Sequence, residues 1–170
     1  SEMCIRDRTK PPKYPSEAPL IDHAIITHSH IDHIGMAPWL VGHHGTTLHG
    51  SRLTSGLSEI MWRDTYKVSS IEGYPLAWDR RDLDAALEAW QEHDMDEEFS
   101  IGSWNVKFHV AGHIPGAVMT EIDVLGKKVL WTGDMDTRSS PNVSGALPVP
   151  CDILCLEGTY GGKYHPDRSE

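Results

Sequence analysis

The alternation of apolar and polar residues divides the chain into short strands separated by helices and loops. Short apolar runs predict strands, and so does the clean alternation around Phe108. The strands predicted in this way are 22–27, 104–110, 117–124, 128–132 and 152–156. The third and fourth of them flank Leu125-Gly126-Lys127 and should form a hairpin.

Helical spacing of apolar residues predicts the other elements. A helix should begin near Met36, and another should cover 54–62 behind a Ser or Thr cap. Leu83, Ala86, Leu87 and Trp90 recur at helical intervals and predict a helix over 79–93. The acidic stretch 95–100 that follows is predicted to be a loop.

Four of the apolar segments run directly into a side chain that can bind a metal or transfer a proton. The residues at these four positions are His28, His113, Asp134 and Glu157. Rigid strands place such groups accurately, while the loops that follow leave them accessible. The pattern therefore predicts a chemical site at one edge of a sheet.

The segment His28-Ser29-His30-Ile31-Asp32-His33 is the most informative of the chain, because it brings three imidazoles and a carboxylate into six residues. Burying such groups without partners costs several kcal/mol. A divalent ion such as zinc binds these nitrogen and carboxylate donors. We therefore interpret the segment as a metal site rather than as a polar turn.

The spacing indicates two ions. His28 and His30 are two residues apart and point to the same side of an extended chain, whereas Asp32 and His33 fall where the chain turns. One segment can then serve two neighbouring ions, as in two-metal hydrolases whose ions lie roughly 3.5–4 Å apart.

His113 and Asp134 are the expected additional ligands. His113 lies between Gly112 and Gly116, which permit a positive φ or a close backbone approach, and Asp134 offers a carboxylate suited to bridging two ions. The remaining histidines receive other roles. His43, His44 and His49 are expected in loops or in support of the ligands, His23 and His93 at the surface, and His109 on the opposite face of its strand.

Length and composition narrow the class of protein. The 170 residues suffice for one domain, and a formal charge of −10 argues against a broad basic surface for nucleic acid. Three cysteines are too few and oddly numbered for a disulfide framework, which favours a reducing cytoplasm. No apolar run reaches membrane-spanning length.

Both ends of the chain look cut. Residues 1–10 show no periodicity and resemble translated adapter sequence, and a proline-rich stretch follows them. We therefore treat 1–19 as a non-native or linker segment and 20–170 as the domain.

Taken in order, four motifs resemble the β-CASP ribonuclease branch of the metallo-β-lactamase superfamily. These motifs are HSHIDH, AGHIPGA, WTGD and LEGTYGGKYHPDR, and they span 22–168. The branch includes the nuclease subunit of the mRNA 3′-end cleavage factor, its archaeal relatives and RNase J-like enzymes. The resemblance implies an α/β fold, a partial αββα sandwich that lacks the N-terminal strands and the β-CASP domain.

The resemblance also implies roles for the candidate residues. His28, His30 and His113 would hold the first zinc, Asp32 and His33 the second, and Asp134 would bridge. Asp32 and Glu157 would be catalytic, Asp32 by orienting the attacking hydroxide and Glu157 by orienting a histidine of the later domain. Gly158 stands where the family usually has Ser or Ala.

The function so implied is that of a zinc-dependent phosphodiesterase that cleaves RNA through a metal-activated hydroxide. The partners would be an RNA substrate, no membrane, and a homodimer or processing complex in the full-length protein. This piece alone should bind the first zinc better than the second and have little or no nuclease activity.

Two alternatives stay open at this point. One is another hydrolase of the same fold, such as a glyoxalase II-like thioesterase or a tRNA 3′-processing nuclease. The other is a non-catalytic scaffold subunit of an RNA-processing complex. Such subunits typically lose ligand residues, whereas every ligand position covered by this chain is filled.

Overall fold

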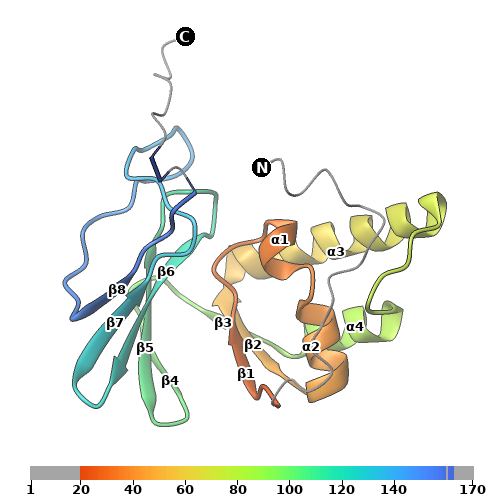
Figure 1. Cartoon of the computed structure of the whole chain (residues 1–170), viewed down its shortest axis with the longest axis horizontal. Helices are drawn as coiled ribbons and strands as arrows, with labels where there is room; N and C mark the ends of the chain where they lie inside the picture. Colours follow the sequence, from red (N-terminus) through yellow and green to blue (C-terminus); the bar gives the residue numbers. More distant parts are fainter. Residues whose placement is uncertain (1–19, 160, 163–170) are drawn as a thin grey trace.

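The computed structural model describes residues 20–159 and 161–162, and within them helices and strands form three layers (Figure 1). The helices are α1 (Ile31–Ile34), α2 (Ala37–His44), α3 (Arg52–Glu72) and α4 (Arg80–Glu88). The strands are β1 (His23–Ile25), β2 (Thr47–Ser51), β3 (Trp90–His93), β4 (Glu98–Ile101), β5 (Trp104–Val110), β6 (Val118–Val124), β7 (Lys127–Trp131) and β8 (Ile153–Cys155). The predicted span 1–19 lies outside the described residues.

The strands form two sheets of different character. The first is parallel, in the order β1-β2-β3, and the second has the order β4-β5-β6-β7-β8 and is antiparallel except for the parallel pair β7–β8. In Figure 1 the helices lie on one side of the parallel sheet and the five-stranded sheet lies on the other. This helix–sheet–sheet arrangement agrees with the α/β prediction and with a partial αββα sandwich.

Apolar side chains fill both spaces between the layers. Trp62, Leu48 and Ile34, all fully buried, lead the cluster between the helices and the parallel sheet. Phe108 and Val118 lead the cluster between the two sheets, and Ile25 packs against it from the parallel sheet. Full burial of a large apolar side chain contributes about 1.5–3 kcal/mol, so these clusters fix how the sheets lie against each other.

Two tryptophans also fix the chain around α1. The indole Nε1 of Trp62 donates to the carbonyl of Ile34 at 2.9 Å, and that of Trp78 donates to the carbonyl of Gly35 at 2.8 Å. Both indoles are buried, so water does not compete for these bonds. The short helix that carries Asp32 and His33 is therefore held at its C-terminal end.

The predicted helix over 79–93 is wrong in its last third. Asp79 caps α4 by accepting bonds from the amides of Arg81 and Asp82, but the helix ends at Glu88. Trp90–His93 instead forms β3, paired in parallel with β2. The pairing with a neighbouring strand outweighs the helical spacing of Trp90.

Two other local predictions also need correction. Residues 98–100 of the expected acidic loop belong instead to β4, an edge strand whose partner is β5. β2 was not predicted, because the sequence Thr47-Leu48-His49-Gly50-Ser51 lacks an apolar run although it occupies the centre of the parallel sheet. The strands at 104–110 and 152–156, the hairpin and the helix near Met36 are confirmed, and α3 is longer than expected.

A chain of three histidines crosses the parallel sheet. His49 Nε2 lies 3.0 Å from His23 Nδ1, and its Nδ1 lies 3.0 Å from His93 Nε2. The ring of His93 stacks on Phe99 at 3.5 Å, so His93 is partly covered and not simply at the surface as predicted. Burial, followed by the neighbouring His93 and His23, lowers the pKa of His49 from 6.5 to about 4.

We predict that His49 makes the metal-free fold less stable at acidic pH. The unfolded chain binds a proton at His49 near pH 6.5 but the folded chain only near pH 4, so this stabilisation is complete above pH 6.5 and is lost as the pH falls to 4. The loss is on the order of 3 kcal/mol. Urea unfolding at pH 7 and pH 4.5 should show a smaller difference for His49→Leu than for the wild type.

The exposed His43, which lies on α2, provides the control for this measurement. His43→Leu should keep the pH dependence of the wild type. An unchanged pH dependence in His49→Leu contradicts the prediction.

Candidate metal centre

The first two ligand candidates follow the end of β1. The backbone continues the strand pairing through Ile26, whose amide donates to the carbonyl of His49 at 2.8 Å. His28 is fully buried and His30 is exposed, and His30 is still extended with φ −67° and ψ 144° before α1 begins. Their side chains therefore point to one side, as the spacing predicted: His28 Nε2 lies 3.1 Å from His30 Nδ1.

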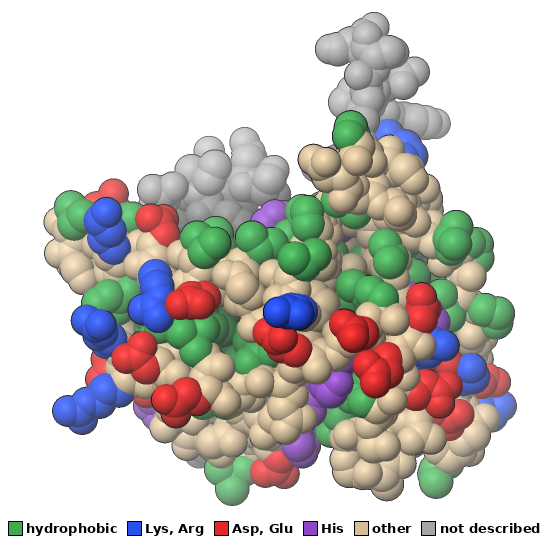
Figure 2. Space-filling view, turned by 180° about the vertical axis from the view of Figure 1, so that it is seen from behind, with side chains coloured by type: hydrophobic (Ala, Val, Ile, Leu, Met, Phe, Trp, Pro, Cys, Tyr) green, Lys and Arg blue, Asp and Glu red, His purple; other side chains and the backbone are tan. Residues whose placement is uncertain are grey.

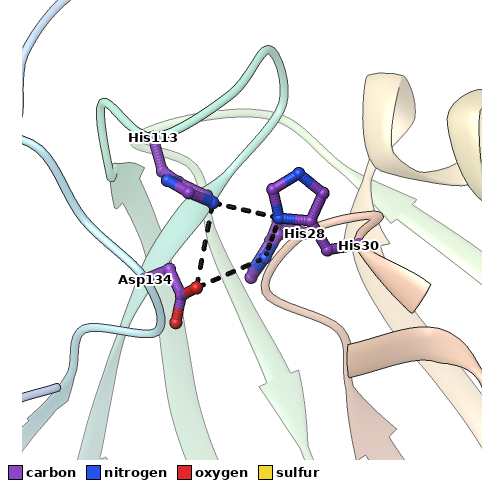
Figure 3. A group of neighbouring side chains, drawn as sticks. All are labelled: His28, His30, His113 and Asp134. Carbon is purple, nitrogen blue, oxygen red and sulfur yellow. Dashed lines mark hydrogen bonds and ion pairs between the residues drawn. The ribbon is translucent and has the colours of Figure 1, made fainter. Parts of the chain in front are cut away.

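His113 and Asp134 come from the other sheet and meet this pair. His113 lies in the connection between β5 and β6, and Asp134 follows β7. His113 Nε2 lies 3.1 Å from His30 Nδ1, and Asp134 Oδ2 lies 3.8 Å from His113 Nε2 and 3.9 Å from His28 Nε2. Figure 3 shows the four side chains converging from separate segments, with one donor atom of each within 4.8 Å of the others.

This donor set fits a divalent ion. Ligand atoms about 2.0–2.1 Å from a tetrahedral zinc lie about 3.3 Å from one another, close to the 3.1 Å spacing of the nitrogens here. Three ring nitrogens cannot satisfy one another by hydrogen bonding, because a neutral imidazole has only one N–H. Three nitrogens and one carboxylate oxygen are the donors that zinc prefers.

The electrostatics of the group keep the imidazoles available as ligands. Burial, and then the neighbouring His33, His113 and His30, lowers the pKa of His28 from 6.5 to about 3. Burial, and then His113, also lowers the pKa of His30. Neutral rings present lone pairs to a metal, so both histidines could bind an ion at neutral pH.

Asp32 and His33 border this group without joining it. His33 Nε2 lies 3.6 Å from Asp134 Oδ1 and 3.9 Å from Asp32 Oδ2. Asp134 thus directs one oxygen toward the three-histidine cluster and the other toward His33. This is the position expected of a bridging carboxylate, but Asp32 and His33 are not part of the group of donors that lie within 4.8 Å of one another among the described residues.

Glu157 lies beside Asp134 and binds backbone. Its Oε1 accepts a bond from the amide of Met135 at 2.7 Å, and its own amide donates to Thr132 Oγ1 at 3.1 Å. Glu157 therefore anchors the residues on both sides of Asp134. With His33 and Asp134 it lines a cavity of about 370 Å³, which opens beside the metal group.

The other histidines in the described part of the chain lie apart from the metal group. His43 stacks on Trp39 at 4.5 Å, and His44 Nδ1 accepts a bond from the amide of Ile21. His49 belongs to the histidine chain of the parallel sheet described above. His109 pairs with Glu121 at 2.8 Å, which confirms that it is not directed to the site.

Comparison with known proteins agrees with the geometry. The profile of the metallo-beta-lactamase superfamily matches residues 19–153, and the chain belongs to this superfamily. The cleavage and polyadenylation specificity factor 73 of Drosophila melanogaster is 31% identical over 160 residues. Subunit 3 of the same factor from Dictyostelium discoideum is 32% identical over 162 residues, and ribonuclease TTHA0252 of Thermus thermophilus is 29% identical over 148.

The match covers most of this chain but little of its relatives. It includes 91% of the chain for the first two relatives and 85% for the third. The chain spans 23%, 21% and 33% of the three relatives, respectively. None of the helices in the described part of the chain is both long and apolar enough to cross a membrane.

We predict that zinc stabilises the chain through the four-residue group. His30→Ala and His113→Ala should each weaken zinc binding roughly 100-fold or more, because loss of a ligand exceeds the 10–100-fold effect of an outer partner. Thermal unfolding of each variant at increasing zinc concentrations measures this change in affinity. His43→Ala is the control and should bind zinc like the wild type, whereas unchanged binding by His30→Ala excludes the site.

Proposed function

We propose that the full-length protein is a zinc-dependent hydrolase that cleaves phosphodiester bonds in RNA. The observation that carries this proposal is the convergence of His28, His30, His113 and Asp134 from two sheets. The names of the relatives, cleavage factors and a ribonuclease, support RNA as the substrate. We also propose that the full-length protein is a β-CASP nuclease that acts in an RNA-processing complex or as a homodimer, in keeping with the names of these relatives.

Each residue takes the role that its position allows. His28, His30 and His113 would hold the first ion, Asp32 and His33 would contribute to the second, and Asp134 would be shared by both. When bound, the ions lower the pKa of water and stabilise the negative charge that develops on the phosphoryl group. Asp32, whose carboxylate is exposed, would also help to orient the attacking hydroxide.

Glu157 and the cavity beside it provide the substrate side of the site. The cavity includes His33, Asp134 and Glu157, so a phosphodiester bound there would contact the metal group. We assign to Glu157 the orientation of a catalytic group supplied by another part of the full-length protein. Free Cys151 and Cys155 suit a reducing compartment such as the cytoplasm.

The surface of this chain supports metal-dependent recognition of RNA. The formal charge is −10, and on the face seen in Figure 2 acidic and basic side chains are mixed, without a continuous basic patch. Broad electrostatic binding of phosphates needs such a patch. With a formal charge of −10, the chain would depend on the bound ions and on other parts of the full-length protein to attract a phosphate.

We predict that the 170-residue chain binds close to one zinc ion and cleaves RNA little or not at all. Its described residues bring four donors within 4.8 Å of one another for the first ion, whereas Asp32 and His33, with the shared Asp134, form no such group. Elemental analysis gives the stoichiometry, and a labelled RNA gives the cleavage rate. Two tightly bound ions together with rapid cleavage would contradict this prediction.

Activity assays on the full-length protein test the proposed function. It should cleave RNA, and His30→Ala should slow cleavage by roughly 1,000-fold or more, since the ions supply most of the electrostatic stabilisation. A glutathione thioester serves as the competing substrate. Hydrolysis of the thioester with intact RNA would indicate a thioesterase, and zinc binding without either activity would indicate a scaffold subunit.

A further inference from the structure

The N-terminus of α3 contacts the connection that carries His113. The hydroxyl of Ser51 donates to the carbonyl of Gly116 at 2.7 Å, and the hydroxyl of Thr54 donates to the same carbonyl at 2.9 Å. The two hydroxyl oxygens lie 3.0 Å apart. One carbonyl oxygen, three residues after His113, thus accepts two hydrogen bonds from a helix that lies more than 60 positions earlier in the chain.

The two side chains that donate these hydrogen bonds are buried. Ser51 is 4% exposed, Thr54 is fully buried and Gly116 is half-buried, so water has little access to the two hydroxyl groups. Each hydroxyl has a single hydrogen, and the carbonyl has two lone pairs, so the acceptor is saturated. We call Ser51, Thr54 and the Gly116 carbonyl the clasp.

Gly116 allows the helix to approach this closely. Its φ is +82°, a conformation that residues with side chains rarely adopt. A Cβ atom at this position would lie 2.7 Å from Leu53 Cβ and 2.9 Å from both Ser51 Oγ and Thr54 N. The close approach is therefore built for glycine and leaves the connection little room to shift.

The clasp acts together with two backbone hydrogen bonds to hold the connection between β5 and β6. At its far end the amide of Val118 donates to the carbonyl of Thr27 at 2.9 Å, and within it the amide of Ala117 donates to the carbonyl of Ile114 at 3.0 Å. The imidazole of His113, in contrast, contacts other members of the metal group. Because these contacts join only members of the metal group, the position of the imidazole before an ion binds depends on the backbone that carries His113.

Ordinary helix capping does not account for the clasp. Ser51 does cap α3, because its Oγ accepts a bond from the amide of Thr54 at 3.2 Å. A cap needs no contact with a distant carbonyl, and Asp79 caps α4 through local amides alone. The hydroxyl of Thr54 has no part in capping, yet it donates to Gly116.

We propose that Ser51 and Thr54 are positioning residues that hold His113 in the geometry for metal binding. They contact neither the ion nor the substrate, and they act through the backbone of residues 113–116. This inference rests on the metal centre proposed above. Removal of either hydroxyl should weaken zinc binding, whereas removal of an unrelated helix cap should not.

Zinc affinity of the 170-residue chain, measured by competition with a chromophoric chelator, tests the proposal. Thr54→Val keeps the shape of the side chain and should weaken binding about tenfold, the lower end of the effect of outer partners of metal ligands. Ser51→Ala should also weaken binding about tenfold. Ser51→Thr should keep the zinc affinity within about twofold of the wild type, because it retains the hydroxyl. Asp79→Ala removes a cap from α4 and should leave zinc affinity unchanged.

Coupling to His113 separates positioning from general destabilisation. In a His113→Ala background, Thr54→Val should cause no further loss of zinc affinity, because the residue through which it acts is gone. An equal tenfold loss in that background overturns the proposal. So does an affinity of Thr54→Val equal to that of the wild type.

Amide hydrogen exchange of the metal-free chain keeps the two proposals distinguishable. Ser51→Ala and Thr54→Val should speed exchange in residues 111–118, and Asp79→Ala should not. If the wild type binds no zinc but the variants speed exchange, the metal centre fails and the positioning of this connection stands. If exchange is unchanged in both hydroxyl variants, the clasp is not a positioning device.

Discussion

The candidate site depends on the fixed placement of two sheets against each other. His28 and His30 follow β1 of the parallel sheet, whereas His113 and Asp134 follow β5 and β7 of the five-stranded sheet. Donor atoms 3.1 Å apart tolerate little movement between their supports. The apolar layer led by Phe108 and the bond from the Val118 amide to the Thr27 carbonyl provide this placement directly beside the ligands.

The metal-free arrangement brings together groups that gain little from one another. His28 is fully buried beside other imidazoles, and its pKa of about 3 reflects the cost of charging it there. The ring therefore stays neutral near pH 7, and the surrounding structure holds the donors together. Trp62 and Trp78 hold the backbone at Ile34 and Gly35, and Glu157 holds the amide of Met135 beside Asp134. The donors are thereby placed before an ion binds, which reduces the ordering that binding requires.

The sequence predicted the site better than it predicted the parallel sheet. Each ligand segment begins where an apolar run stops, so His28, His113 and Asp134 could be expected at one sheet edge, and the two-residue spacing of His28 and His30 was sufficient to predict their common direction. β2 and β3 could not be recognised, because Thr47-Leu48-His49-Gly50-Ser51 is polar and Trp90 continues the spacing of α4. Both become strands through pairing with neighbours, which local sequence does not encode. The clasp was missed for the same reason, since nothing near Thr54 indicates a contact with Gly116.

Under the proposed function, the negative charge of the chain would give the ions a second role besides the activation of water. Asp134 and Glu157 line the cavity where a phosphate would approach, Asp32 Oδ2 lies 3.9 Å from Nε2 of His33, which lines the same cavity, and the formal charge of the whole chain is −10. Without cations these carboxylates would repel a phosphodiester, whereas bound divalent ions would bring positive charge to the same place. Metal binding would thus reverse the local field that a phosphodiester meets. In this way an acidic domain of this superfamily would act on a polyanion, because attraction would be concentrated at the bond to be cleaved.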